Sequence, residues 1–345
     1  MARERIVSGE ELGGDDEQLN RALRPQSLDE CIGMSDLLEK LRISITASRQ
    51  RNEPMEHVLL HGPPGLGKTT LAYVIAHEMG SAIKVTSGPA LTRAGDLIGI
   101  LTNLDTRDVL FIDEIHRLAP AVEEYIYPAM EDFKVDFVVD SGMHSRTINL
   151  PLKPFTLIGA TTRSGMLSPP LRTRFGITHH LDFWSPQELL ARGHMSARML
   201  GIAYEEAALE LLSERARGTP RIANRLLRRC RDFAQVKGDG RLTVAMVQSA
   251  LELEGIDELG LDDLDRRFLR IIIDTYRGGP VGIEAVAATL GDDTDTLVDV
   301  VEPFLLQMGL LARTRRGRLA TIKAYKHLGV QGAPPADDSP LFEQE

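Results

Sequence analysis

Cysteine is scarce in this sequence, and the two cysteines that occur are far apart. Cys31 and Cys230 stand alone among 345 residues, and no C-x-x-C pair exists. This scarcity excludes a disulfide framework and a zinc knuckle, and it suits a reducing compartment. No apolar run approaches the ~20 residues that a bilayer crossing requires. Because the N-terminal residues also lack the apolar core of a secretion signal, we expect a cytoplasmic protein without a membrane partner.

Basic residues are outnumbered by acidic ones, which taken alone argues against a nucleic-acid-binding protein. The chain has 40 Lys and Arg against 50 Asp and Glu, a formal charge of −10. Placement matters more than the total, however, because basic residues can be clustered. Residues 313–326 carry six basic side chains and no acidic one. This cluster predicts contact with a nucleic-acid phosphate backbone, and a solvated loop is the alternative.

Short apolar segments alternate with helical stretches in the first half of the chain. Segments typical of buried strands lie at 57–60, 82–86, 108–113, 155–160 and 179–183. Continuous apolar strands with intervening helices indicate a parallel sheet that is covered on both faces. We therefore predict an α/β domain over residues 1–184, ordered from about residue 20.

Two smaller domains and a tail are expected to follow. Residues 185–255 are helical in pattern throughout and predict a small all-α domain, with Ser185 as the cap of its first helix. Helices fit 262–276, 282–290 and 294–308, and a hairpin turning at Gly317 comes next. Helices followed by such a hairpin are typical of a winged-helix domain, here 256–330. Residues 331–345 are rich in Pro, Asp and Glu and predict a disordered acidic tail.

A phosphate-binding loop is the strongest motif in the chain. Residues 62–70 spell GPPGLGKTT and complete the pattern G-x-x-x-x-G-K-[ST]. Glycines such as Gly65 let backbone N–H groups approach the phosphates, Lys68 reaches the β- and γ-phosphates, and Thr69 ligates Mg²⁺. A strand before the loop and a helix after it, over 68–79, fit this interpretation. The motif predicts that the protein binds ATP and Mg²⁺.

Polar residues end two of the other expected strands. Asp113 and Glu114 follow the strand at 108–113, where one carboxylate can lie near the Mg²⁺ and the other can activate water. A solvated helix cap is the alternative, but the position some 45 residues after the P-loop favours catalysis. Thr162 ends a later strand and could contact the γ-phosphate or the attacking water, although Thr is common there for other reasons.

Three arginines are candidates for contact with the nucleotide. Arg172 and Arg174 follow a Pro-rich loop, from which an exposed arginine could reach a nucleotide bound by a neighbouring subunit. Arg221 begins a helix that could fold back over the nucleotide. For each of them an ordinary surface arginine is the alternative.

Residues 133–150 have the pattern of an inserted β-hairpin. Two-residue alternation flanks the turn-like residues Asp140, Ser141 and Gly142. An apolar excursion of this kind predicts a docking surface, and an ordinary surface hairpin is equally compatible with the spacing.

Taken in order, these segments resemble the AAA+ ATPases and, more narrowly, the bacterial RuvB family of Holliday-junction branch-migration motors. The resemblance extends from about residue 23 to 328. It rests on residues 23–25, 62–70, 86–89, 113–118, 127–133, 159–163, 217–229 and 278–282. The P-loop and the Asp-Glu pair are shared by the whole superfamily, whereas the blocks YPAMEDF and RGTPRIANRLLRR are much more specific.

The resemblance implies nucleotide-binding roles at matching positions. Leu23, Arg24 and an aromatic residue at position 184 would surround the adenine, although this chain has Trp184 where the family usually has Tyr. The phosphates and Mg²⁺ would be held by Gly65, Lys68, Thr69 and Thr70, with Asp113 acting on Mg²⁺ through water. Thr162 and Arg221 would sense the nucleotide. The neighbouring subunit would contribute Arg174, Glu131, Asp132 and Phe133.

The resemblance also implies partners. Arg313 and Arg318 would contact double-stranded DNA, the 133–150 hairpin would bind RuvA, and the RuvC resolvase would join the same complex. The family assembles as a homohexamer. The implied function is an ATP-driven translocase that promotes branch migration of Holliday junctions in recombination and DNA repair.

Two other functions are compatible with parts of the sequence. One is a clamp loader or replication initiator, although the finger segment here is LRTRF and a winged helix replaces the collar. The other is a DNA-binding regulator whose P-loop domain only signals. The presence of Glu114 beside Asp113 argues against an inactive ATPase.

Overall fold

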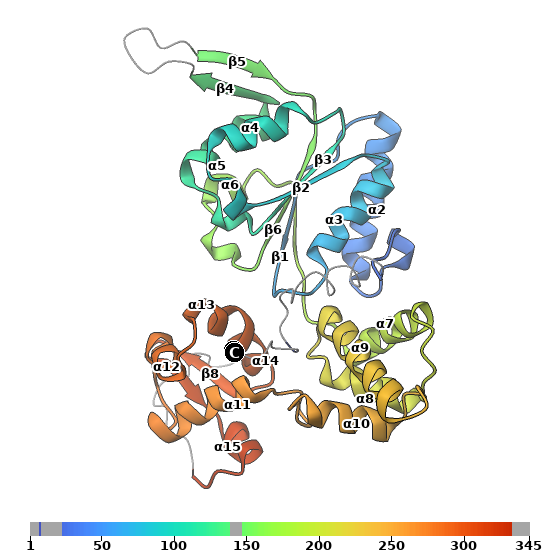
Figure 1. Cartoon of the computed structure of the whole chain (residues 1–345). Coiled ribbons are helices and arrows are strands. Elements are labelled where there is room, and N and C mark those ends of the chain that lie inside the picture. Colours follow the sequence, from blue (N-terminus) through green and yellow to red (C-terminus); the bar gives the residue numbers. More distant parts are fainter. Residues whose placement is uncertain (1–6, 8–22, 139–146, 333–345) are drawn as a thin grey trace, which may run out of the picture. The chain divides into compact units, whose positions relative to one another are not determined.

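The computed structural model describes residues 7, 23–138 and 147–332 of the chain. The fold divides into two compact units (Figure 1): one comprises residues 22–62 and 66–182, and the other contains the chain from Phe183 onward. Within the described residues, no helix is both long and apolar enough to cross a membrane. Residues 333–345 of the predicted acidic tail lie outside the described residues.

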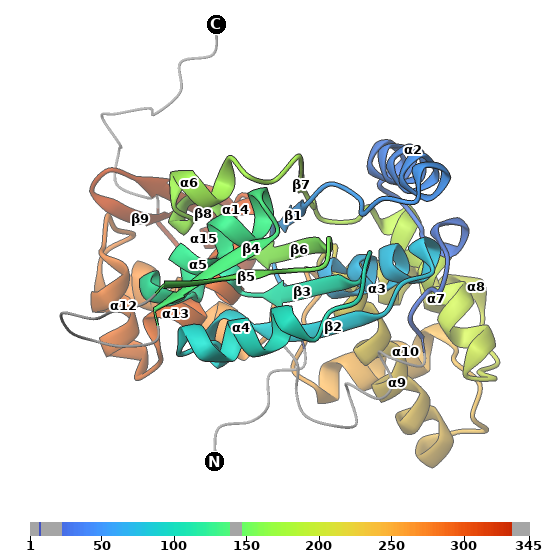
Figure 2. The same cartoon turned by 90° about the horizontal axis from the view of Figure 1, so that it is seen from above.

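A five-stranded parallel sheet forms the centre of the first unit and confirms the predicted α/β fold. Its strands are β1 (Val58–His61), β2 (Ile83–Ser87), β3 (Val109–Asp113), β6 (Thr156–Thr161) and β7 (Ile177–His180). They lie in the order β2-β3-β6-β1-β7, and every neighbouring pair is parallel (Figure 2). The carboxyl ends of β3, β6 and β1 therefore meet at one edge, where the predicted catalytic residues follow the strands.

Helices cover both faces of this sheet. Helices α2 (Ser35–Arg51) and α3 (Lys68–Met79) lie on one side, and α4 (Ala94–Thr102), α5 (Pro120–Glu131) and α6 (Pro169–Arg172) lie on the other (Figure 1). Short 3₁₀ turns complete the unit at Leu28–Glu30, Gly88–Ala90, Ile115–Arg117 and Ser164–Met166. Helix α3 has the bounds that the sequence predicts.

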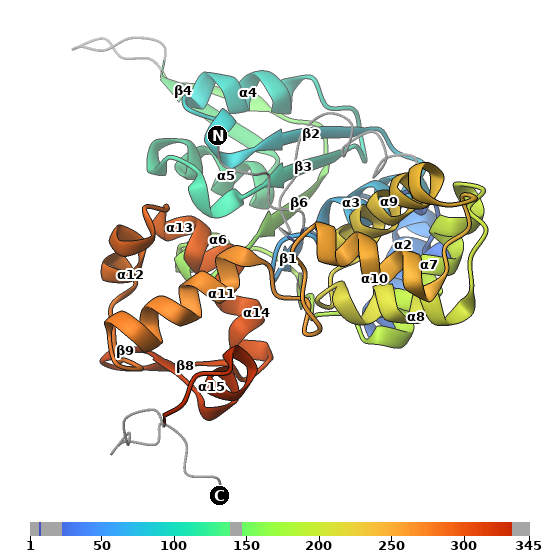
Figure 3. The ribbon, with the colours of Figure 1, turned by 60° about the horizontal axis from the view of Figure 1, so that its bottom comes forward.

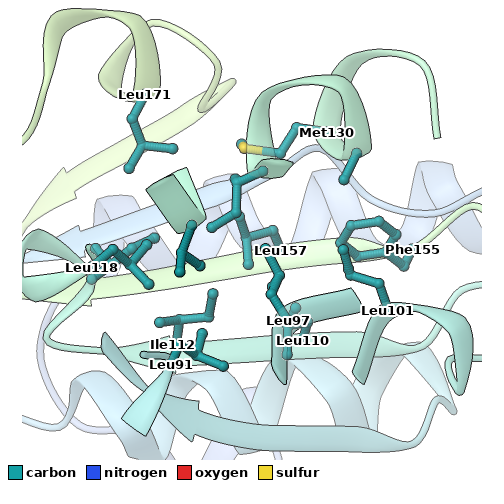
Figure 4. Close-up of a cluster of buried hydrophobic side chains, with 14 of the residues drawn as sticks. Leu91, Leu97, Leu101, Leu110, Ile112, Leu118, Met130, Phe155, Leu157 and Leu171 are labelled. Carbon is teal, nitrogen blue, oxygen red and sulfur yellow. The ribbon is translucent and has the colours of Figure 1, made fainter. Parts of the chain in front are cut away.

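Apolar side chains fill the space between the sheet and the helices α4, α5 and α6. Figure 4 shows Leu110, Ile112 and Leu157 pointing from the strands toward this side. Leu101 of α4 and Met130 of α5 complete the same cluster, and all five side chains are buried. Continuous burial of this kind explains why the strand segments are apolar throughout rather than alternating.

The predicted hairpin exists as an antiparallel pair, β4 (Lys134–Val138) with β5 (Thr147–Pro151). The pair extends beyond α4 (Figure 1), while Val135 at its base is fully buried in the core cluster. The turn of the hairpin, at 139–146, lies outside the described residues.

The second unit begins with four helices, which confirm the helical prediction for this segment: α7 (Pro186–Met199), α8 (Glu206–Arg215), α9 (Pro220–Lys237) and α10 (Val244–Leu253) (Figure 3). Ser185 caps α7 as predicted, because its hydroxyl accepts from the Glu188 N–H at 3.2 Å while the Glu188 side chain accepts from the Ser185 N–H at 2.7 Å. Such a capping box satisfies two N-terminal donors that a helix otherwise leaves open.

The chain after α10 forms the predicted helices and hairpin of a winged helix. Helix α11 (Asp263–Arg270) continues into a wider helical turn at Ile271–Thr275. After it come α12 (Ile283–Leu290) and a helical stretch consisting of α13 (Thr294–Thr296), Leu297–Val301 and α14 (Glu302–Gln307). Strands β8 (Leu311–Thr314) and β9 (Gly317–Ala320) form the hairpin. A last helix, α15 (Ile322–Leu328), was not predicted.

His57 connects three parts of the first unit. Its Nδ1 accepts a hydrogen bond from the Leu157 N–H at 2.8 Å, and its Nε2 lies 3.1 Å from the Met130 carbonyl oxygen. The ring is therefore neutral with its proton on Nε2. Its edges also pack against Phe133 and Phe155, with ring centroids 6.5 and 5.8 Å away. His57 thus links the sheet to the end of α5.

This arrangement predicts a pH-dependent contribution to stability. Burial lowers the pKa of His57 below its ordinary value, so the folded protein binds fewer protons here than the unfolded chain does. The contribution of His57 to the stability of the folded protein is therefore complete above the pKa of the unfolded chain, about 6.5, and falls as the pH drops below that value. We expect the His57→Asn protein to lose less stability between pH 7.5 and 5.5 than the wild type, measured by urea unfolding.

The matched control is His77→Asn, which removes an exposed histidine from α3. It should leave the pH dependence unchanged. Equal slopes for His57→Asn and the wild type would show that His57 does not titrate in this way.

Candidate functional site

The P-loop has the backbone geometry that phosphate binding requires. Gly62, Gly65 and Gly67 have φ values of 138°, 80° and 100°, which favour glycine. A Cβ on Gly62 would lie 2.4 Å from the carbonyl oxygen of Leu181, so no side chain fits there. The loop can therefore turn its N–H groups toward a bound anion at the start of α3.

Lys68 lies at the start of α3 and is almost fully buried, with 7% of its surface exposed. Its Nζ donates a hydrogen bond of 2.8 Å to the Gly62 carbonyl oxygen, which holds the ammonium group over the loop. Thr69 and Thr70 follow in the first helical turn and are partly exposed. The ammonium group of Lys68 and the hydroxyls of Thr69 and Thr70 thus belong to the first turn of α3, as the sequence predicts.

Asp113 and Glu114 end β3 on the same edge of the sheet. Glu114 has a left-handed backbone, with φ 47° and ψ 46°, and its N–H donates to Asp113 Oδ1 at 2.9 Å. Left-handed geometry in a residue other than glycine costs about 1–3 kcal/mol and is concentrated at functional sites. Here it turns the two adjacent carboxylates to different positions.

Glu114 lies within hydrogen-bond distance of Thr162, the residue expected to sense the nucleotide. Thr162 Oγ1 donates to Glu114 Oε2 at 3.2 Å. Burial raises the pKa of the Glu114 carboxyl above its ordinary value, and the charge of Asp113 adds to the rise, whereas Lys68 and Thr162 act in the opposite direction. A carboxylate with raised proton affinity is a better general base for water.

Gly88 determines how closely the chain after β2 approaches Glu114. A Cβ on Gly88 would lie 2.4 Å from the Glu114 carbonyl oxygen and 3.2 Å from the Leu118 nitrogen. Only glycine allows this approach, which holds the left-handed turn at Glu114 in place. This explains on physical grounds why the segment 86–89 contains a glycine.

His116 is a neighbour of this site that sequence reasoning did not identify. Its Nδ1 lies 3.1 Å from Glu114 Oε2 and 2.9 Å from Thr161 Oγ1, and only 4% of the side chain is exposed. His116 lies in the block 113–118, on which the family resemblance rests, two residues after Glu114, but no role was assigned to it.

Arg174 contacts residues of both α5 and α6. It donates to the Pro170 carbonyl oxygen at 2.6 Å, its guanidinium lies 4.5 Å from the centre of the Tyr127 ring, and it pairs with Glu131 at 3.1 Å. The structure thus brings together two residues, Arg174 and Glu131, that were both expected to contact a neighbour's nucleotide.

A hydrogen-bond network that the sequence did not predict supports Arg174. Tyr127 donates to Glu123 at 2.5 Å and lies 3.2 Å from the Ser168 hydroxyl, which also bonds Glu123. Ser168 caps α6 by accepting from the Leu171 N–H. The network fixes the ring on which Arg174 stacks.

The other residues expected to contact that nucleotide follow Glu131. Asp132 pairs with Lys134 at 2.8 Å, and both are exposed or partly exposed. Phe133 has φ 48° and packs edge-on against Phe155, with ring centroids 5.9 Å apart.

Residues expected at the adenine are placed within each unit. In the first, Leu23 is buried and the Arg24 guanidinium lies 4.3 Å from the centre of the Tyr73 ring on α3. In the second, the backbone N–H of Trp184 donates to the Gly218 carbonyl oxygen at 2.8 Å. Arg221 lies in the first turn of α9, just after this loop.

Three of the side chains expected to contact the nucleotide carry a buried nitrogen that has no hydrogen-bond partner among the described residues. They are Nε of Arg24, Nε of Arg174 and Nε1 of Trp184. Buried donors are normally satisfied. Donors left open at residues already assigned to a nucleotide fit the binding of such a ligand.

The two arginines expected to contact DNA are placed differently. Arg313 on β8 is exposed, as are Arg315 and Arg316 in the turn. Arg318 on β9 is only 9% exposed and forms two hydrogen bonds to the carboxylate of Glu302, one of them 3.1 Å long. Its side chain is thus occupied within the winged helix, which the sequence did not predict.

Three protein-family models match consecutive segments of the chain. The Holliday junction DNA helicase RuvB P-loop domain matches residues 23–181, the RuvB AAA lid domain matches 184–257, and the RuvB C-terminal winged helix domain matches 258–329. The RuvB branch-migration subunit of Kosmotoga olearia is 54% identical over 339 residues, which cover 97% of this chain and 98% of that protein. The chain belongs to the RuvB family.

Other RuvB proteins give the same result. The Myxococcus xanthus RuvB branch-migration subunit is 52% identical over 342 residues, covering 99% of each chain. The solved structure of the Thermotoga maritima RuvB Holliday junction branch migration motor is 51% identical, has a TM-score of 0.83, and covers 90% of this chain and 99% of that one. As a RuvB-family member the chain is a nucleotide-binding AAA+ ATPase, and neither a clamp loader nor a signalling regulator is favoured.

The position of Gly88 yields a test of how Glu114 is held. Gly88→Ala should displace the Glu114 backbone, because the new Cβ would meet its carbonyl oxygen at 2.4 Å. We expect ATP binding to persist and kcat for hydrolysis to fall about 10²-fold, the cost of roughly 1 Å of misplacement. Equilibrium nucleotide binding and phosphate release measure the two effects separately.

Gly99→Ala in α4 is the matched control, because nothing lies within 4 Å of a Cβ at that position. It should hydrolyse ATP at the wild-type rate. A Gly88→Ala protein that does the same would contradict the role assigned to this contact.

Proposed function

We propose that this chain is the ATP-driven motor that moves Holliday junctions by branch migration in DNA recombination and repair. The observation that carries the proposal is the meeting of Lys68, Glu114 and Thr162 at one edge of the sheet, in a chain that matches RuvB through all three of its domains. We propose domain limits of 1–184, 185–255 and 256–330. A DNA motor of this kind belongs in the cytoplasm, where bacterial DNA lies.

The P-loop would hold the triphosphate. Backbone N–H groups around Gly65 and the ammonium group of Lys68 would bind the β- and γ-phosphates, with Thr70 beside them. Mg²⁺ prefers oxygen ligands, which Thr69 supplies directly and Asp113 supplies through water. When bound, the metal neutralises charge on the phosphate oxygens.

Glu114 would act on the attacking water. The water oxygen bonds the γ-phosphorus, the bond from that phosphorus to the bridging oxygen of ADP breaks, and ADP leaves with the electron pair. Glu114 accepts the water proton. Thr162, hydrogen-bonded to Glu114 at 3.2 Å, keeps the carboxylate oriented toward that water. His116 contacts the same oxygen and restricts its movement.

A neighbouring copy of the chain would complete the site. Arg174, Glu131, Asp132 and Phe133 lie on α5 and α6 or next to them, and Arg174 pairs with Glu131. We propose that these residues face the nucleotide of the next subunit in a homohexamer. Arg174 then stabilises the charge that develops on the γ-phosphate, an effect typically worth ~10³–10⁵ in rate.

The residues expected at the adenine would each contribute to its recognition. Leu23 supplies an apolar surface, and the open donors of Arg24 and Trp184 can bond ring nitrogens. Trp184 keeps an aromatic face for stacking. Arg221 would sense the γ-phosphate from the start of α9.

The winged helix would hold DNA through its exposed hairpin. Arg313, Arg315 and Arg316 can contact phosphates without reading sequence. Arg318 would contribute by holding the hairpin against Glu302, and would contact DNA itself only by exchanging that partner. The β4–β5 hairpin would bind RuvA, and RuvC would join the complex. Support for the RuvA contact is the extension of the hairpin beyond the body of the first unit.

Mixing two inactive variants tests the shared site. Lys68→Ala removes the phosphate ligand but keeps the arginine, and Arg174→Ala does the reverse. Each alone should lack ATPase activity and should not move a synthetic four-way junction in the presence of RuvA. A one-to-one mixture should recover about a quarter of the wild-type ATPase rate, because about one interface in four combines two intact halves.

Arg172→Ala is the control for the arginine, because Arg172 is exposed and lies two residues before Arg174, at the end of α6. This protein should hydrolyse ATP and move junctions without a partner variant. If the mixture stays as inactive as its components, Arg174 does not act across subunits. If the wild type hydrolyses ATP with RuvA but moves no junction, the motor function itself is wrong.

A further inference from the structure

One arginine of the loop before α9 has no role in nucleotide binding, yet it is the most extensively bonded side chain of that loop. Arg217 lies four residues before Arg221, the proposed nucleotide sensor. It directly precedes Gly218, whose carbonyl oxygen accepts from the backbone N–H of Trp184. It has a left-handed backbone, with φ 56°. Only 2% of its side chain is exposed.

The Arg217 side chain crosses from the lid helices into the winged helix. Its Nε donates to the Gly260 carbonyl oxygen at 2.7 Å, and a terminal nitrogen pairs with Asp265 on α11, which is fully buried. The guanidinium carbon also lies 4.6 Å from the centre of the Phe304 ring on α14. One cation thus contacts the linker between the two domains and two helices beyond it.

The partners of Arg217 are themselves fixed. Asp265 accepts from the Asp262 N–H at 3.0 Å and so closes the capping box of α11. Phe304 lies in the winged-helix core, on the same helix as Glu302, the residue that binds Arg318 of the DNA-facing hairpin. Helix α14 therefore contacts Arg217 through Phe304 and the hairpin through Glu302.

Further contacts clamp the linker beside these residues. Arg266 donates to the carbonyl oxygens of Gly255 and Leu261, each at 2.8 Å, and the His327 ring lies 2.8 Å from Asp257. Linkers between domains usually permit relative motion. A buried ion pair with additional hydrogen bonds has one geometry instead, because any separation leaves charges unpaired away from water.

We propose that Arg217 is a positioning residue that makes the lid and the winged helix turn as one body during the ATPase cycle. A movement of α9 caused by hydrolysis then reaches the DNA-facing hairpin without loss in the linker. This inference rests on the proposed motor function, since it concerns how that motor transmits movement. It assigns Arg217 no part in the chemistry of hydrolysis.

The test separates hydrolysis from movement in the full chain assembled with RuvA on a four-way junction. Arg217→Ala alone removes the cation beside the buried Asp265 carboxylate, so that a loss of folding would obscure the result. The main variant is therefore Arg217→Met combined with Asp265→Asn, because the Asn oxygen can still cap α11 while the buried charge is removed. The control is Arg231→Ala, which removes an arginine that pairs with its neighbour Asp232 on α9.

We expect the double variant to hydrolyse ATP within twofold of the wild type and to move junctions at least tenfold less per ATP hydrolysed. The control should match the wild type in both. Arg217→Lys, which keeps the charge without the planar fork, should fall between them. A purely structural role predicts that ATPase and movement fall together. That outcome, or wild-type movement per ATP in the double variant, would overturn the proposal.

Distances between the domains give a second test that does not depend on junction movement. Spin labels can be placed at Met199 on α7 and Ile322 on α15, both well exposed. Cys230 is only 1% exposed and therefore inaccessible to the label, and burial also raises the pKa of its thiol. Cys31→Ser removes the other cysteine. The wild-type distance distribution should stay narrow with ATP or ADP, and the double variant's should broaden. Equally broad distributions in both would contradict rigid coupling at Arg217.

These results distinguish the two proposals. A wild-type protein that moves no junction refutes the motor function, whatever Arg217 does. A wild type that moves junctions beside a double variant that moves them as efficiently refutes only the coupling.

Discussion

The backbone of Gly88 lies so near the carbonyl oxygen of Glu114 that no side chain fits between them. This contact holds the left-handed turn that places the carboxylate beside Thr162. The strand order β3-β6-β1 then brings Glu114, Thr162 and the P-loop lysine to three adjacent strand ends. Nucleotide chemistry therefore depends on a close approach of backbones, which the parallel sheet repeats at Gly62 against Leu181.

Arginines hold side chains in fixed arrangements within each unit. Arg174 stacks on the Tyr127 ring, which hydrogen bonds hold in place, and pairs with Glu131. Arg217 and Arg318 are buried against carboxylates in the second unit. In each case the planar guanidinium makes more than one contact in a fixed geometry, which a lysine ammonium does not impose. These arginines thus hold neighbouring side chains in place through their ion pairs.

The sequence predicted most of the fold and the place of the P-loop before α3, because these depend on local patterns. Helix α3 follows directly from the P-loop, and apolar runs marked the strands. Contacts between distant residues were not predictable in this way. Arg318 was assigned to DNA through the family resemblance, but its partner Glu302 lies 16 residues earlier and becomes its neighbour only through folding. Helix α15 was hidden in the same basic cluster, and the bonds of His57 span 73 and 100 residues.

The central claim is that Glu114 takes the proton from the water that attacks ATP, and that this step drives junction movement. Glu114→Gln keeps the shape of the side chain and its contact with Thr162 but removes the base. The most direct measurement compares this protein with the wild type on a synthetic four-way junction with RuvA, while nucleotide binding is recorded in parallel. We predict unchanged ATP binding, hydrolysis slower by about 10²–10⁴-fold, and no branch migration. Branch migration by Glu114→Gln at the wild-type rate would contradict the account.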